Sequence, residues 1–155
     1  MPIYVLAFLV GVVAGLRSMT PPAAVSWAAR LGWLHLENTP LALLGFAATP
    51  YILSLFAIAE LINDKLPKTP SRKTLAPFTA RIVTGAFSGA ALGAPSGALP
   101  GGLLAGALGG VAGTLAGYEF RRMLVKTTGG KDLPIAILED AIAICAAFWI
   151  VSGAI

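Results

Sequence analysis

The chain has 155 residues, of which 57% are hydrophobic and only 12% are charged, and its formal net charge at pH 7 is +4. Its mean hydropathy of +0.82 lies far above that of soluble domains, whose surfaces need more polar residues. These values exclude a second, soluble domain, and we expect one transmembrane helical domain over residues 1–155. The single cysteine, Cys145, excludes an intramolecular disulfide and a cysteine-based metal site.

The apolar segments predict an all-α integral membrane protein with about five spans, because each span needs ~20 apolar residues. The first segment covers residues 3–20 and stops at Pro21 and Pro22, which break a helix. Thr20 is a candidate N-cap for a short interfacial or re-entrant helix over residues 22–34. The remaining spans are expected at residues 41–63, with a kink at Pro50, and at 77–94, 103–120 and 133–151.

Two basic stretches, residues 64–73 and 121–131, set the expected topology. Cytoplasmic loops carry the excess of Lys and Arg, so both stretches should face the cytoplasm of a bacterial inner membrane. Five spans then place the N-terminus in the cytoplasm and the C-terminus outside. Spans one and four would run in opposite directions, and the similarity of residues 11–16 to residues 113–118 indicates a weak inverted repeat. Anionic headgroups explain the basic loops, so no nucleic-acid partner is needed.

Ionisable side chains interrupt the apolar segments at five positions: Glu60, Asp64, Arg81, Glu139 and Asp140. Charges at such depth are costly in lipid and usually mark a site for an ion or a substrate. Glu60 and Asp64 are four residues apart, so they project from one side of a helix. Four acids with one intramembrane arginine favour a bound cation or a shared proton. The alternative is structural, with Arg81 neutralising one or two of the acids.

A metal ion is a tentative occupant of the same acidic cluster. Carboxylates without histidine suit hard cations such as magnesium or manganese, and the candidate ligands are Glu60, Asp64, Glu139 and Asp140. No cofactor other than a cation or protons is expected.

A second group of polar residues precedes the short helix: Arg17, Ser18 and Thr20 lie just before Pro21. Helix N-termini and arginine attract anions, as in transporters with broken helices. We expect this anion site at the membrane face opposite the acidic cluster. The alternative is a helix cap, with Arg17 extending to lipid phosphates.

Glycines recur at four-residue spacing on the third and fourth spans. Arg81 continues the first series and should point into the bundle; the series are Gly85, Gly89 and Gly93, then Gly102, Gly106 and Gly110, then Gly109, Gly113 and Gly117. Such series let membrane helices approach closely. The same glycine faces are also suited to contacts in a homo-oligomer or in a larger membrane complex.

Several segments resemble a bacterial integral-membrane family known only as a domain of unknown function. They are residues 15–21 (GLRSMTP), Glu60 with residues 64–72 (DKLPKTPSR), residues 80–81 (AR) and residues 139–141 (EDA). The resemblance covers nearly the whole chain and implies a polytopic inner-membrane protein. It brings no substrate, cofactor or reaction.

Three function classes remain open. The first is a small transporter or channel that uses the acidic cluster for a cation or proton and the Arg17 site for an anionic group. The second is a structural or accessory subunit of a membrane complex, with the charges as ion pairs. The third is a lipid-modifying membrane enzyme, which ranks lowest because no nucleophile motif accompanies the carboxylates.

Overall fold

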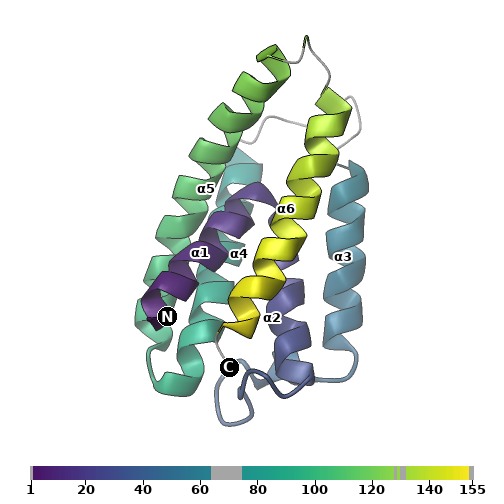
Figure 1. Ribbon diagram of the computed structural model, residues 1–155. Coiled ribbons are helices and arrows are strands. Elements are labelled where there is room, and N and C mark those ends of the chain that lie inside the picture. Colours follow the sequence, from purple (N-terminus) through teal and green to yellow (C-terminus); the bar gives the residue numbers. More distant parts are fainter. Residues whose placement is uncertain (1, 64–74, 128, 130–131, 154–155) are drawn as a thin grey trace.

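The computed structural model describes residues 2–63, 75–127, 129 and 132–153 (Figure 1). Within these residues the chain is helical, without strands, which confirms the predicted all-α class. The helices are α1 (Ile3–Leu16), α2 (Thr20–Arg30), α3 (Thr49–Asn63), α4 (Leu75–Gly93), α5 (Leu99–Thr127) and α6 (Asp132–Ser152), with 3-10 turns η1 (Ala42–Gly45) and η2 (Ala94–Ser96).

Two of the described helices are long and apolar enough to cross a membrane. They are α5, with a mean hydropathy of 1.4, and α6, with 2.0, and only 33% and 39% of their most apolar segments is buried. Helices α1 and α3 are apolar but have 14 and 15 residues, so each is about 21–23 Å long against a hydrocarbon core of about 30 Å. The helices thus give a weak indication of a membrane location, with fewer clear spans than the five predicted.

Glycines bring α1, α4 and α5 into backbone contact. A Cβ atom at Gly11 or at Gly85 would overlap the carbonyl group of Gly106, and one at Gly89 would overlap that of Gly102. The predicted role of the glycine series in close helix packing is therefore confirmed. These contacts make the three helices one tightly packed group, which we call the glycine trio.

Helices α1 and α5 run in the same direction. Gly11 lies against Gly106, and one turn further along α1, Gly15 lies against Gly113. The predicted opposite directions of these segments are wrong, which removes the arrangement that an inverted repeat needs. The reason is that α1 ends at Leu16 inside the bundle instead of crossing it.

The start of α1 and the end of α6 lie toward the same end of the bundle (Figure 1). Helix α2 turns back toward the end from which α1 started, so the two helices together enter and leave at one end. The prediction of chain ends on opposite sides of the membrane did not include this return. It treated residues 3–20 as a complete span, whereas the prolines in the first turn of α2 start a returning helix.

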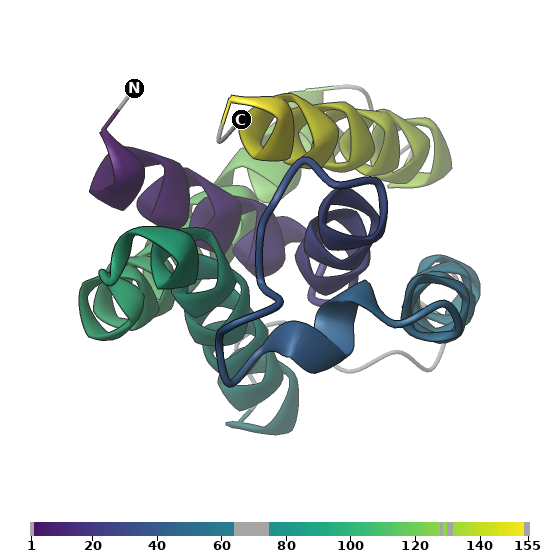
Figure 2. The same cartoon turned by 90° about the horizontal axis from the view of Figure 1, so that it is seen from below.

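Helix α3 lies at the edge of the bundle and packs on α2 and η1 (Figure 2). The predicted kink at Pro50 is wrong, because Pro50 occupies the first turn of α3, where its missing N–H is tolerated. The indole Nε1 of Trp27 donates a hydrogen bond of 2.9 Å to Ser54 Oγ, and its ring lies 5.1 Å from that of Tyr51. Large apolar side chains on α3 stay exposed: Tyr51, Ile52, Leu55, Phe56, Ile58 and Ile62. Such a face is typical of contact with lipid or a partner.

Candidate functional site

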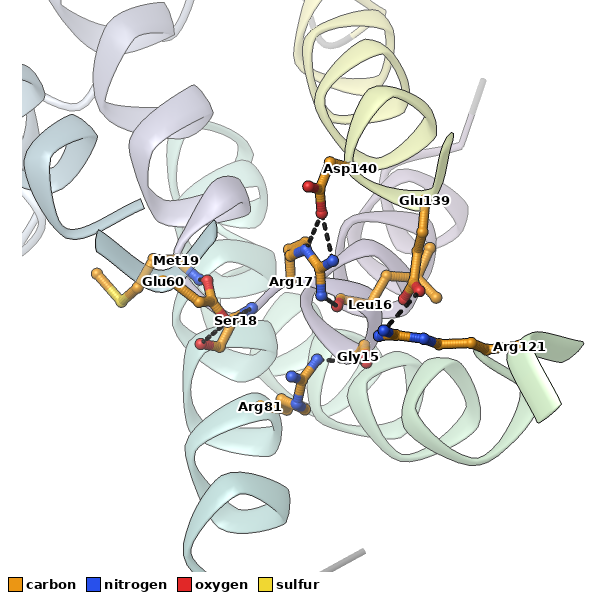
Figure 3. Close-up of polar contacts among 10 residues, drawn as sticks. All are labelled: Gly15, Leu16, Arg17, Ser18, Met19, Glu60, Arg81, Arg121, Glu139 and Asp140. Atoms are coloured by element: carbon orange, nitrogen blue, oxygen red, sulfur yellow. Dashed lines mark hydrogen bonds and ion pairs between the residues drawn. The ribbon is translucent and has the colours of Figure 1, made fainter. Parts of the chain in front are cut away.

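The candidate site is the break between α1 and α2, formed by Arg17, Ser18 and Met19 (Figure 3). Arg17 has an extended backbone (φ −143°, ψ 112°), which ends α1, and Pro21 and Pro22 then begin α2. Met19, not the predicted Thr20, is the N-cap residue. The break brings the last carbonyl groups of α1 and the first N–H groups of α2 to one place, and both sets lack partners within their own helices.

Arg17 and Asp140 form a buried ion pair that joins the break to α6. Arg17 is 0% exposed and Asp140 is 8% exposed. Arg17 Nε donates to Asp140 Oδ1 at 2.5 Å, and Nη2 also pairs with this oxygen. Arg17 Nη1 donates to the carbonyl oxygen of Leu16 at 3.2 Å. One guanidinium therefore stabilises the end of α1 and neutralises a carboxylate on α6.

The carboxylate of Glu60 caps the start of α2. Its Oε1 accepts hydrogen bonds from the backbone N–H of Ser18 at 2.8 Å and from Ser18 Oγ at 2.7 Å. Its Oε2 accepts from the backbone N–H of Met19 at 2.8 Å. The positive end of the helix dipole favours an anion here, and α3 supplies it. The prediction that Glu60 and the Arg17 group lie at opposite faces is therefore wrong.

Arg81 binds the end of α1, whereas Glu60 binds the start of α2. It is 4% exposed, as its predicted inward direction requires, and Nη1 donates to the carbonyl oxygen of Gly15 at 2.8 Å. Gly15 belongs to the last turn of α1, whose carbonyl groups form the negative end of the helix dipole. A buried cation thus faces the end of α1, and a carboxylate faces the start of α2.

Glu139 points away from Asp140, because neighbouring residues on a helix project about 100° apart. Its Oε2 lies 3.7 Å from Nη1 of Arg121 on α5 (Figure 3). Sequence reasoning assigned Arg121 to a basic loop, whereas α5 continues to Thr127. One signal could have placed it, because Arg121 continues the series Gly113 and Gly117 at four-residue spacing.

The predicted acidic cluster is not assembled among the described residues. They hold no group of three or more His, Cys, Asp or Glu side chains that could bind a metal ion, and Asp64 lies outside them. Glu60, Glu139 and Asp140 each face a different partner. The excess of acids that favoured a cation also disappears, since Arg17 and Arg121 join Arg81 to give three arginines for the three described acids of the predicted cluster.

The three residues of the predicted anion site, Arg17, Ser18 and Thr20, all lie at or beside the break. Ser18 contributes both its N–H and its hydroxyl group to the Glu60 carboxylate. Thr20 is 5% exposed, in the first turn of α2. Arg17 pairs with Asp140, and its full burial excludes the alternative in which it extends to lipid phosphates.

Comparison with known proteins identifies a family. A family model described as Domain of unknown function (DUF4126) matches residues 4–152, which include the break and all of its charged partners. No curated protein and no solved structure matches the chain.

Proposed function

The chain belongs to the family described as Domain of unknown function (DUF4126), and we propose that it is a small inner-membrane transporter or channel in which an anion and a proton bind together at the α1–α2 break. The anion takes the place of the Glu60 carboxylate at the start of α2, and the proton neutralises Glu60. Of the acids in the predicted cation cluster, only Glu60 is needed for this function.

The observation that carries the proposal is the position of Glu60. Its carboxylate accepts from two backbone N–H groups and one hydroxyl group at a helix N-terminus, which is how proteins bind free anions. A carboxylate held there acts as a built-in competitor for an external anion. Protonation removes its negative charge and weakens its hold, so the donors become available. Broken helices whose ends face bound ions are a recurring device of membrane transporters.

The membrane arrangement that fits this function has four spans, α3 to α6, with α1 and α2 as a broken pair entering from one face. The basic residues 64–73 stand in the sequence between α3 and α4, and those of residues 121–131 run from the last turns of α5 to the start of α6. Because cytoplasmic loops carry an excess of Lys and Arg, we place both connections on the cytoplasmic side. Both termini then lie outside. The polar backbone of the break is tolerated at depth because protein, not lipid, surrounds it.

The test measures proton movement into vesicles that contain the purified protein and a pH-sensitive dye. Gradients of chloride, nitrate and inorganic phosphate serve as probes, and we expect at least one to drive protons across the membrane. In Glu60→Gln the side chain cannot take up a proton, so anion flux should continue while proton movement is lost. Glu37→Gln, at an exposed acid, is the matched control. A folded wild-type protein that moves no proton with any of the three anions would overturn the proposal.

A structural or accessory role is the second candidate, and the exposed apolar face of α3 favours it. In that case the charges at the break stabilise the bundle, and α3 is covered by a larger membrane complex. Glu60→Gln would then lower the yield of folded protein without changing any flux. Co-purification of a fixed partner, lost on polar substitution of Leu55, would support this role.

A further inference from the structure

A cavity of about 280 Å³ lies at the end of the bundle where α1 starts, which the proposed topology places outside (Figure 1). Its walls include Ile3 on α1, residues 32–35 after α2, and Leu92 and Ser96 at the end of α4 and in η2. This volume is enough for several water molecules, each of which takes about 30 Å³. His35 and Ser96 are exposed, so the cavity has polar side chains in contact with solvent. It can therefore hold a small hydrated ion.

The hydroxyl group of Ser88 on α4 is buried without a hydrogen-bond partner. Ser88 is 0% exposed, and its Oγ finds neither a donor nor an acceptor among the described residues. Buried hydroxyl groups are normally paired, and that of Ser26, which is buried equally, donates to the carbonyl oxygen of Leu44. An unpaired buried hydroxyl group costs free energy unless something outside the chain pairs with it. The position of Ser88 therefore indicates a ligand.

Ser88 lies on the face of α4 that connects the cavity with the break. Residues four and seven apart share one face of a helix. Leu92, four residues after Ser88, lines the cavity, and Arg81, seven residues before it, donates to the carbonyl oxygen of Gly15 at the break. Leu92 and Arg81 are 2% and 4% exposed, so this face points into the bundle. At 1.5 Å per residue, Ser88 lies about 6 Å along α4 from Leu92 and about 10 Å from Arg81.

The contact of α2 with α1 and α4, which we call the seam, is loosely built. Helices α1 and α4 meet backbone to backbone at Gly85, whereas α2 makes far fewer contacts with either of them. Ala91 on α4 belongs to the same apolar core as Ala24 and Ala28 on α2, so small side chains close the seam. Such a contact opens with less displacement than interlocked backbones do.

We propose that a small inorganic anion passes along the seam between the cavity and the break, and that the Ser88 hydroxyl group donates a hydrogen bond to it on the way. Leu92 closes the seam toward the cavity. The proposal rests on the transporter or channel function proposed above and adds the route to it. The chemistry of the seam favours an anion, because a hydroxyl group is a donor and α1, α2 and α4 contain no Asp or Glu. A cation would find no carboxylate there.

The experiment measures whether water-soluble thiol reagents reach residue 88 in the folded full chain. Three variants are made in a Cys145→Ser background, which removes the natural cysteine: Ser88→Cys, Ser96→Cys at the cavity, and Ser26→Cys as the matched buried control. Each is treated with an anionic and a cationic methanethiosulfonate reagent, and intact-protein mass spectrometry gives the labelling rate. Every rate is divided by that of the exposed Ser96→Cys variant with the same reagent, which removes differences in intrinsic reactivity.

We expect the anionic reagent to label Ser88→Cys about tenfold faster than Ser26→Cys, the ratio that ~1.4 kcal/mol of easier opening produces. The normalised rate with the cationic reagent should be lower. Labelling of Ser88→Cys no faster than that of Ser26→Cys would overturn the route. A cationic reagent that reacts as fast as the anionic one would overturn the assignment of the route to anions.

Ser88→Ala separates a place on the route from a structural role. Removal of an unpaired buried hydroxyl group should leave the melting temperature unchanged or raise it, whereas anion-driven proton movement should fall about tenfold, the effect of one hydrogen bond of ~1.4 kcal/mol. Ser26→Ala, which loses a paired hydroxyl group, should lower the melting temperature and keep the flux per folded protein. The reverse pattern in Ser88→Ala would overturn its role. If the wild type moves no anion, fast labelling of Ser88→Cys would still show that the seam opens, so failure of transport and failure of the route are distinguishable.

Discussion

The two sides of the bundle are held together by different kinds of contact. In the glycine trio, α1, α4 and α5 meet backbone to backbone, and any added Cβ atom would overlap a neighbour. Helices α2, α3 and α6 are joined to that group and to one another by side chains. Apolar side chains of α1, α2 and α6 share one core, and polar contacts such as Glu60 and the Arg17–Asp140 pair add to it. Backbone packing resists displacement, whereas a few hydrogen bonds can open and close. The break lies at this boundary, since α1 belongs to the trio and α2 does not.

The largest effect is expected from Gly106→Leu. Gly106 lies against both Gly11 and Gly85, so a side chain there would separate all three helices of the trio. Overpacking costs about 1–3 kcal/mol where neighbouring side chains can move aside, and the backbone neighbours here cannot, so we expect a loss of more than about 5 kcal/mol. Thermal unfolding in detergent and the yield of monodisperse protein measure it.

The control for this substitution is Gly45→Ala. A Cβ atom at Gly45 meets Ala29 at 3.6 Å, an ordinary contact, and the residue lies outside the trio. We expect its melting temperature to stay near that of the wild type. Similar losses in both variants would show that the trio is no more tightly packed than the rest of the bundle.

The next largest effect concerns the buried ion pair. Arg17→Met or Asp140→Leu alone leaves one charge uncompensated inside the bundle, and each should destabilise by about 3–5 kcal/mol. The double variant removes both charges and should recover much of that stability. Equilibrium unfolding of the four proteins gives the coupling energy of the pair. Strictly additive losses would contradict a direct interaction. The pair would then not be one of the polar contacts that join α6 to the glycine trio.

The same comparison explains what the sequence could reveal. Glycine spacing is a local pattern, and it correctly predicted close packing by α4 and α5 and the inward direction of Arg81, but not that α1 joins them. The partners of the charges depend on contacts between distant residues, such as Arg17 with Asp140, for which a single sequence has no local signal. The structure differs from the prediction in the bounds of the first apolar segment. The 14 residues of α1 were joined to the first residue of α2 in a single span.

The smallest effect is expected where α3 is attached to α2. Ser54→Ala removes the acceptor of the Trp27 indole N–H but keeps the contact between the Trp27 and Tyr51 rings. We expect a loss of about 1 kcal/mol, the usual contribution of one hydrogen bond. Because α3 packs on α2 and η1, amide hydrogen exchange should increase in α3 and remain unchanged in α5. Faster exchange in α5 as well would mean that α3 and the glycine trio unfold as one unit. The break would then not separate a part of the bundle that opens easily from a part that is rigidly packed.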